Sequence, residues 1–204
     1  LRRQRQMCIR DSYKMNQNFV KVNQNQLDVD IDLKYASKNN FTGNKVYSSK
    51  SCFLHKIAFE HLCIAVDIAK KLGLKIKIFD AYRPTYVQKK LWDTLPDPNF
   101  IAPPKKGSPH SRGIAIDLTL VRNGKELDMG TEFDEFSKLS YHGCLNISKI
   151  AYQNRLTLLG IMTDSGWDFY RNEWWHYQLF NSKDYKIIEN RLFGLSKIFF
   201  LKLR

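Results

Sequence analysis

The sequence predicts an α+β fold in a single domain, with a mostly antiparallel sheet flanked by helices. A chain of 204 residues, 43% of them hydrophobic, can bury one sizeable core but is short for two. Segments with the two-residue period of strands and segments with helical spacing both occur. They do not follow the regular strand–helix–strand rhythm of a doubly wound sheet, which favours the α+β class.

Four elements are expected in the first half of the chain from their hydrophobic periodicity. In the first, apolar and charged residues alternate, which is the period of a half-buried strand. The second has helical spacing, lysines in its last turn and then Gly73, a residue typical of helix C-termini. The expected elements are a strand at 28–35, a helix at 55–72, a strand around 76–78 that leads into 80–84, and a helix from Thr85 to before Pro96.

The second half begins with a loop and ends in short aromatic strands. Five of the six prolines fall within residues 96–109, a density that excludes regular structure and predicts an exposed loop. Asn123-Gly124 is a dipeptide typical of a two-residue hairpin turn. The expected elements are a strand at 114–121, a helix at 147–160 ended by Gly160, and strands at 167–170 and 174–179.

Charge and composition limit the classes of partner. The net charge of +13 would suit a nucleic-acid-binding protein, but residues 1–12 contribute +3 and residues 191–204 contribute +4, which leaves +6 for the remainder. No zinc-finger spacing or RNA-recognition motif accompanies this charge. No apolar run reaches the roughly 18 to 20 residues of a membrane span. We expect neither a nucleic-acid partner nor a membrane span, and the sequence leaves the oligomeric state open.

The two ends of the chain differ from the rest. Residues 1–12 include Met-Cys-Ile-Arg-Asp-Ser, which resembles a translated sequencing adaptor, so we interpret them as a non-native extension. Residues 191–204 form an apolar, basic tail of uncertain origin, and the domain is expected to span residues 13–190. No signal peptide is recognisable, which favours the cytoplasm, with the periplasm as the alternative if a signal preceded the doubtful start. The four cysteines form no CxxC pair and are expected to be reduced.

The segment Ser108-Pro-His-Ser-Arg-Gly-Ile-Ala-Ile-Asp117 places an imidazole and a carboxylate, both good zinc ligands, seven residues apart. In one straight strand, His110 and Asp117 would lie on opposite faces and roughly 23 Å apart, at about 3.3 Å per residue. The chain must therefore bend between them for both to reach one ion, and Gly113 is placed to allow that bend.

A second motif, Glu173-Trp-Trp-His176, offers a third ligand and a base. His176 would complete a three-ligand site with a fourth position for water, which is the arrangement of catalytic zinc. Glu173 could take the proton of that water as it attacks a carbonyl and return it to the leaving amine. Arg83 could stabilise the oxyanion, oriented by Asp80 three residues earlier.

Each of these residues alone has a simpler structural interpretation. A single His or Asp is far more often structural than a ligand, and Asp80 with Arg83 could be a plain ion pair. Trp174 and Trp175 are expected in the core and the pocket wall. The joint pattern, not any single residue, is what indicates a metal site.

Together these motifs resemble the D-alanyl-D-alanine dipeptidases, zinc peptidases of the VanX type that are related to D,D-carboxypeptidases. The resemblance runs from about residue 27 to about residue 179. Two further segments, Lys34-Tyr-Ala with Asn40-Phe-Thr-Gly43 and Met129-Gly-Thr-Glu-Phe-Asp134, favour the dipeptidases over the carboxypeptidases. The matching motifs are SxHxxGxAxD at 108–117, ExxH at 173–176 and YRP at 82–84.

The resemblance implies a hedgehog/D,D-peptidase-like fold and one Zn²⁺ per chain, held by His110, Asp117 and His176. It implies Glu173 as the catalytic base and Arg83 as the group that stabilises the transition state. The expected reaction is hydrolysis of the dipeptide D-Ala-D-Ala to two D-alanines by a zinc-bound water that Glu173 activates.

The resemblance also suggests that Ser108 and Asp134 help to hold the free amino end of a small dipeptide substrate, since a carboxylate pairs naturally with an ammonium group. The alternative function is that of a D,D-carboxypeptidase or endopeptidase acting on peptidoglycan stem peptides, which would need an open cleft. A catalytically inactive binding module would have no need of Glu173.

Overall fold

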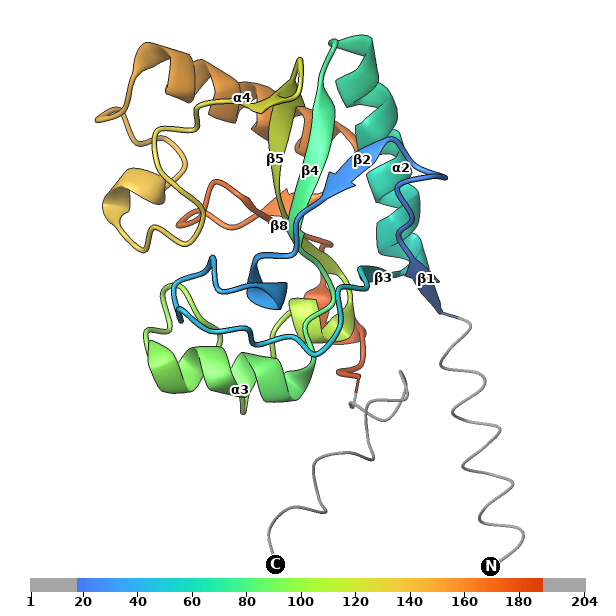
Figure 1. Ribbon diagram of the computed structural model, residues 1–204, viewed down its shortest axis with the longest axis vertical. Helices are drawn as coiled ribbons and strands as arrows, with labels where there is room; N and C mark the ends of the chain where they lie inside the picture. The colour runs from blue at the N-terminus through green and yellow to red at the C-terminus, as the bar shows by residue number, and fades with distance from the viewer. Residues whose placement is uncertain (1–17, 189–204) are drawn as a thin grey trace, which may run out of the picture.

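A six-stranded sheet forms the centre of the molecule, which a computed structural model describes from residue 18 to residue 188 (Figure 1). Its strand order is β2-β4-β5-β8-β7, and the short β6 pairs with β5. The β2–β4 pair is parallel and the other pairs are antiparallel, so the predicted α+β class is confirmed. The strands are β2 (Val29–Ile31), β4 (Lys75–Asp80), β5 (Ala115–Arg122), β6 (Lys125–Glu126), β7 (Asp168–Phe169) and β8 (His176–Gln178).

Two long helices cover the apolar face of this sheet. Helices α2 (Lys56–Lys71) and α4 (Lys149–Asp164) contact each other, and they contact β4, β5 and β7. Alternate residues of β4 and β5 pair across the strands on this face and are fully buried. These residues are Ile76, Ile78, Leu118 and Leu120.

The remaining elements lie around the sheet. Strands β1 (Phe19–Lys21) and β3 (Phe53–His55) form a separate antiparallel pair, and helix α3 (Thr85–Thr94) follows the end of β4. Four short 3-10 helices complete the described chain: Lys34–Ala36, His110–Arg112, Lys138–Ser140 and Ser182–Asp184. The helix predicted from Thr85 and the irregular proline-rich loop are both confirmed.

The predicted elements differ from the observed ones mainly at their ends. The strand expected at 28–35 pairs only over Val29–Ile31, because the chain then enters the 3-10 helix Lys34–Ala36. The helix expected to end at Gly160 continues to Asp164, so that prediction of its end was wrong. A glycine inside a helix weakens it without ending it.

The Asn123-Gly124 turn is confirmed. It joins β5 to β6 by a two-residue loop, and Arg122 pairs with Lys125 across it. Asn123 has a φ of 52° and Gly124 a φ of 77°, the left-handed conformation that a type I′ turn requires at both central positions.

The predicted limits of the domain fall partly outside the described residues. The proposed extension at 1–12 and tail at 191–204 lie there, as does Cys8. Between residues 18 and 188, Cys52, Cys63 and Cys144 are free thiols. No helix in that part of the chain is long and apolar enough to cross a membrane.

Leu118→Ala is expected to lower the free energy of unfolding by about 2–5 kcal/mol, because it leaves a cavity on the fully buried face of β5. Leu156→Ala removes the same atoms from a position of α4 that is 50% exposed, and it should change stability by less than about 0.5 kcal/mol. Urea unfolding of both variants measures the difference. Equal losses would contradict the assignment of this face of β5 to the core.

Candidate metal centre and active site

Three neighbouring strands bring Asp80, Asp117 and His176 into one row. Asp117 of β5 pairs with Asp80 of β4 on one side and with His176 of β8 on the other. Directly paired residues of an antiparallel sheet point to the same face, with Cβ atoms about 4.5–5.5 Å apart. The sheet itself therefore positions these three side chains next to one another.

Asp80 joins this row because β4 contains an irregularity. Ile76 and Ile78 face the helices, and simple alternation would turn Asp80 to the same apolar side. The register shifts between Ile78 and Asp80, so that Asp80 pairs directly with Asp117. A β-bulge of this kind redirects the side chains that follow it.

His110 reaches the same point from a single turn of 3-10 helix that ends at Gly113. Gly113 has a φ of 71°, which reverses the chain before β5 begins. Its carbonyl accepts a 2.8 Å hydrogen bond from the backbone N–H of His55, and a Cβ at this position would lie 2.3 Å from the ring of Phe19. The bend that the sequence requires between His110 and Asp117 is confirmed, at the predicted residue.

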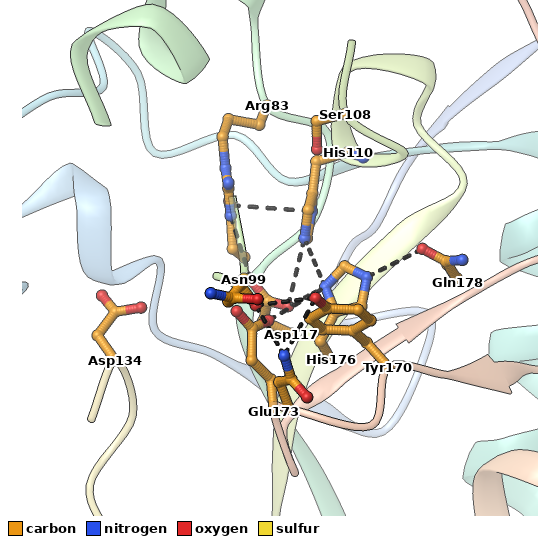
Figure 2. A network of polar contacts seen from close by, with 12 residues as sticks. Arg83, Asn99, Ser108, His110, Asp117, Asp134, Tyr170, Glu173, His176 and Gln178 are labelled. Atoms are coloured by element: carbon orange, nitrogen blue, oxygen red, sulfur yellow. Dashed lines mark hydrogen bonds and ion pairs between the residues drawn. The ribbon is translucent and has the colours of Figure 1, made fainter. Parts of the chain in front are cut away.

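One nitrogen of each histidine and one oxygen of Asp117 converge on a single point (Figure 2). His110 Nε2 lies 3.1 Å from His176 Nδ1 and 3.2 Å from Asp117 Oδ1, and His176 Nδ1 lies 2.9 Å from the same oxygen. All three residues are buried. Within residues 18–188, this is the one group of His, Cys, Asp or Glu side chains with the spacing of a metal site.

Outer hydrogen bonds turn the lone pairs of both histidines inward. His110 Nδ1 lies 2.7 Å from the carbonyl oxygen of Ala81, and His176 Nε2 lies 3.2 Å from Oε1 of Gln178. Because both oxygens can only accept, each neutral ring carries its proton on the outer nitrogen. The two inner nitrogens and the carboxylate oxygen then have no proton to share, and a cation between them removes their mutual repulsion. The donor set therefore fits a metal ion.

The carboxylate of Asp117 is ionised in this setting. Burial alone would raise its pKa, but positive charge beside it, on protonated His110 and His176 rings or on a cation between the neutral rings, lowers the pKa of Asp117 below its ordinary value. An ionised carboxylate is the form that binds a metal.

Glu173 lies beside this cluster. Its Oε2 is 3.9 Å from His176 Nδ1, and the side chain is buried. Burial and the nearby carboxylates of Asp117 and Asp134 raise the pKa of Glu173 well above its ordinary value, while Arg83 opposes the rise. A buried carboxyl group whose proton affinity is raised has the property that a general acid–base group needs.

Arg83 is held by acceptors on three sides. Its Nε donates to Asp80 Oδ2 at 2.8 Å, Nη1 to Gln88 Oε1 at 3.1 Å and Nη2 to Asp117 Oδ2 at 3.3 Å. Burial alone would lower the pKa of Arg83, but the neighbouring carboxylates of Asp80 and Asp117 raise it above its ordinary value. Arg83 is therefore a fixed positive charge next to the cluster, and Asp80 orients it as the sequence suggests.

These groups line a cavity of about 290 Å³ that also contains Ser108 and Asp134. Ser108 Oγ accepts a 3.2 Å hydrogen bond from the backbone N–H of His110. Asp134 has a φ of 63°, and its Oδ1 accepts a 3.0 Å hydrogen bond from the Tyr35 hydroxyl. Its Oδ2 is buried and has no hydrogen-bond partner among the described residues, which marks a position for a donor. In Figure 2 Asp134 stands apart from the His–Asp–His cluster.

All seven residues predicted for the site line this one cavity: Arg83, Ser108, His110, Asp117, Asp134, Glu173 and His176. Four residues that were not predicted for the site bind predicted residues or line the same cavity: Tyr35, Gln88, Tyr170 and Gln178. Tyr35 lies in the Lys34-Tyr-Ala segment that supports the family resemblance, so a signal existed for it. The other three follow no motif.

A buried His–Asp–His cluster with a glutamate and an arginine beside it is the kind of site that mononuclear metallopeptidases contain. The chain belongs to the Peptidase_M15 family, described as D-ala-D-ala dipeptidase, and the match covers residues 15–194.

Several proteins named as dipeptidases or D,D-peptidases are similar to this chain. It is 41% identical to the D-alanyl-D-alanine dipeptidase of Escherichia coli (strain K12) over 165 residues, which are 80% of this chain and 86% of the relative. It is 35% identical to the D-alanyl-D-alanine dipeptidase of Enterococcus faecium, over 72% of this chain and 84% of the relative. Among solved structures, a mutant of the vancomycin resistance D,D-pentapeptidase VanY in complex with Zn(II) matches with a TM-score of 0.43 and 15% identity, over 67% of this chain and 78% of that one.

Gly113→Ala is expected to lower the free energy of unfolding by about 2–4 kcal/mol, because the new methyl group adds left-handed strain and overlaps the Phe19 ring. Gly43→Ala is the matched control: Gly43 also has a positive φ, of 64°, but nothing lies within 4 Å of its Cβ position. This control should show only the strain of about 1–2 kcal/mol. Denaturant unfolding compares the two, and equal losses would show that the bend at Gly113 is not closely packed.

Proposed function

We propose that this protein hydrolyses D-Ala-D-Ala to two D-alanines, with one zinc ion held by His110, Asp117 and His176. The observation that supports this most strongly is the inward convergence of two histidine lone pairs and a carboxylate at 2.9–3.2 Å. Two imidazole nitrogens and one carboxylate oxygen suit zinc and leave a fourth tetrahedral position. Membership of the family and the names of the relatives support the substrate.

Glu173 is the residue placed to move protons in this reaction. When bound, zinc supplies a Lewis acid that polarises the scissile carbonyl and acidifies water. Glu173 lies close enough to the ligand cluster to take a proton from the attacking water and deliver it to the leaving amine. Positive charge at the cluster opposes the burial that raises the pKa of Glu173, which favours its ionised, basic form.

Arg83 is placed to stabilise the negative charge that develops on the carbonyl oxygen. Its Nη2 lies 3.3 Å from Asp117 Oδ2, so the guanidinium borders the ligand cluster. Because Asp80 and Gln88 fix its orientation, little reorganisation is needed as the charge develops. Burial strengthens this interaction by excluding water.

The two ends of the dipeptide need opposite partners. We assign the ammonium group to Asp134, whose free Oδ2 can accept from it while Tyr35 holds Oδ1. Ser108 Oγ accepts one hydrogen bond from the His110 N–H, so its second lone pair and its hydroxyl proton are left for the substrate. The second lone pair can accept from the substrate's ammonium group, the role that the sequence suggests for Ser108.

The size of the cavity favours a dipeptide over the alternative stem-peptide substrates. A volume of about 290 Å³ falls just below the roughly 300–1,000 Å³ of pockets for drug-sized ligands. Assays with D-Ala-D-Ala and with a pentapeptide that ends in D-Ala-D-Ala separate the two functions. Cleavage of the pentapeptide would support the D,D-carboxypeptidase or endopeptidase alternative.

The cytoplasmic location remains a prediction from the sequence.

Glu173→Gln is expected to keep one zinc per chain while kcat falls by about 10²–10⁴-fold, because the amide cannot accept the proton of the water. His176→Ala should lose the metal, because it removes one of the three ligands. Metal analysis and D-Ala-D-Ala turnover of both variants test these roles. Substantial activity in Glu173→Gln would exclude Glu173 as the base, and full metallation of His176→Ala would remove His176 from the ligand set.

A further inference from the structure

Part of the active-site wall has no regular secondary structure. Residues 98, 100, 101, 102 and 103 all line the cavity, and the hydrogen bonds within this stretch form only local turns. A segment of this kind is held in place by its contacts with the rest of the protein. We call residues 97–103 the roof segment.

The turn between β7 and β8 binds the roof segment at the carbonyl oxygen of Asn99. The Tyr170 hydroxyl donates to this oxygen at 2.8 Å and Asn172 Nδ2 donates to it at 3.1 Å, while Asn172 Nδ2 also lies 3.3 Å from the Tyr170 hydroxyl. Asn99 and Tyr170 lie close together in front of the His–Asp–His cluster (Figure 2). The same turn carries Glu173, and the ring of His176 packs edge-to-face on Tyr170 at 6.1 Å.

Further contacts hold the far end and the middle of the roof segment. Gln88 Nε2 donates to the carbonyl oxygen of Ala102 at 2.7 Å, and Gln88 Oε1 accepts from Arg83. Phe100 packs against Phe136 with ring centroids 5.2 Å apart. The roof segment is thus tied to three walls of the cavity, each of which carries a predicted site residue or a neighbour of one.

The Asn99 contact is more exposed than the contacts at Gln88 and at Ile101, which is buried in the core. Gln88 is buried, whereas Tyr170 and Asn172 are only half-buried and Asn99 is exposed. Breaking the bonds to Asn99 therefore exposes few apolar groups, and this edge is where the roof segment can part from the wall most easily. A peptide longer than the cavity needs such an opening.

We propose that Tyr170 and Asn172 determine substrate length: their hydrogen bonds to the Asn99 carbonyl hold the roof segment closed and exclude peptides longer than two residues. This proposal rests on the dipeptidase function proposed above and names residues that restrict it. Neither side chain takes part in the bond-breaking step. Their effect is on which peptides enter.

The test uses the full-length, zinc-loaded protein and the double variant Tyr170→Phe/Asn172→Ala, which removes both donors. Values of kcat/KM are measured for D-Ala-D-Ala and for the tripeptide L-Lys-D-Ala-D-Ala. Loss of two hydrogen bonds should raise the tripeptide-to-dipeptide ratio by about tenfold or more. Tyr86→Phe is the control, because it removes a hydroxyl that contacts Ser48 outside the cavity, and it should leave the ratio unchanged.

A second readout does not depend on activity. Chymotrypsin cleaves after Phe100 in the roof segment, and native-state cleavage at this bond should be at least several times faster in the double variant than in Tyr86→Phe. An unchanged rate of chymotrypsin cleavage, or a tripeptide-to-dipeptide ratio within twofold of the wild-type value, would overturn the proposal. If the protein still cleaves D-Ala-D-Ala in that case, the proposed function stands. Wild-type protein that cleaves no dipeptide would overturn both.

Discussion

The site depends on three electron-pair donors held within 2.9–3.2 Å of one another in a buried position. Such an arrangement is unfavourable without a cation, because two lone pairs and a negative charge face each other away from water. It persists when the surrounding structure fixes each donor independently. Here the strands fix Asp117 and His176, a 3-10 turn fixes His110, and outer oxygens fix both histidine tautomers.

The two faces of the sheet have different roles: one forms the core and the other carries the site. One face packs its apolar residues under α2 and α4, and this core keeps β4, β5 and β8 in register. The other face carries the polar row, and two local irregularities complete it. The bulge in β4 turns Asp80 towards Asp117, and the left-handed Gly113 brings His110 back over β5. Both irregularities give up regular hydrogen bonding in order to place one side chain.

The sequence was most informative where two metal-binding residues close together in the chain require a bend between them. A bend between His110 and Asp117 follows from their spacing alone, and Gly113 is the residue that allows it. The bulge in β4 was not predictable, because residues 76, 78 and 80 alternate as in a regular strand. The same holds for contacts between distant segments, such as that of Tyr35 with Asp134, 99 residues away. The acceptors at Ala81, Asn99 and Ala102 are backbone carbonyls, which every residue has, so no motif could reveal them.

The most direct measurement is a titration of metal-free protein with zinc while D-Ala-D-Ala hydrolysis is followed. We expect no turnover without metal, a rise in proportion to added zinc, and a plateau at one zinc per chain, because the described residues offer one group of three converging ligands. Turnover by the metal-free protein, or a requirement for a second equivalent of zinc, would contradict a reaction that depends on His110, Asp117 and His176 holding a single ion.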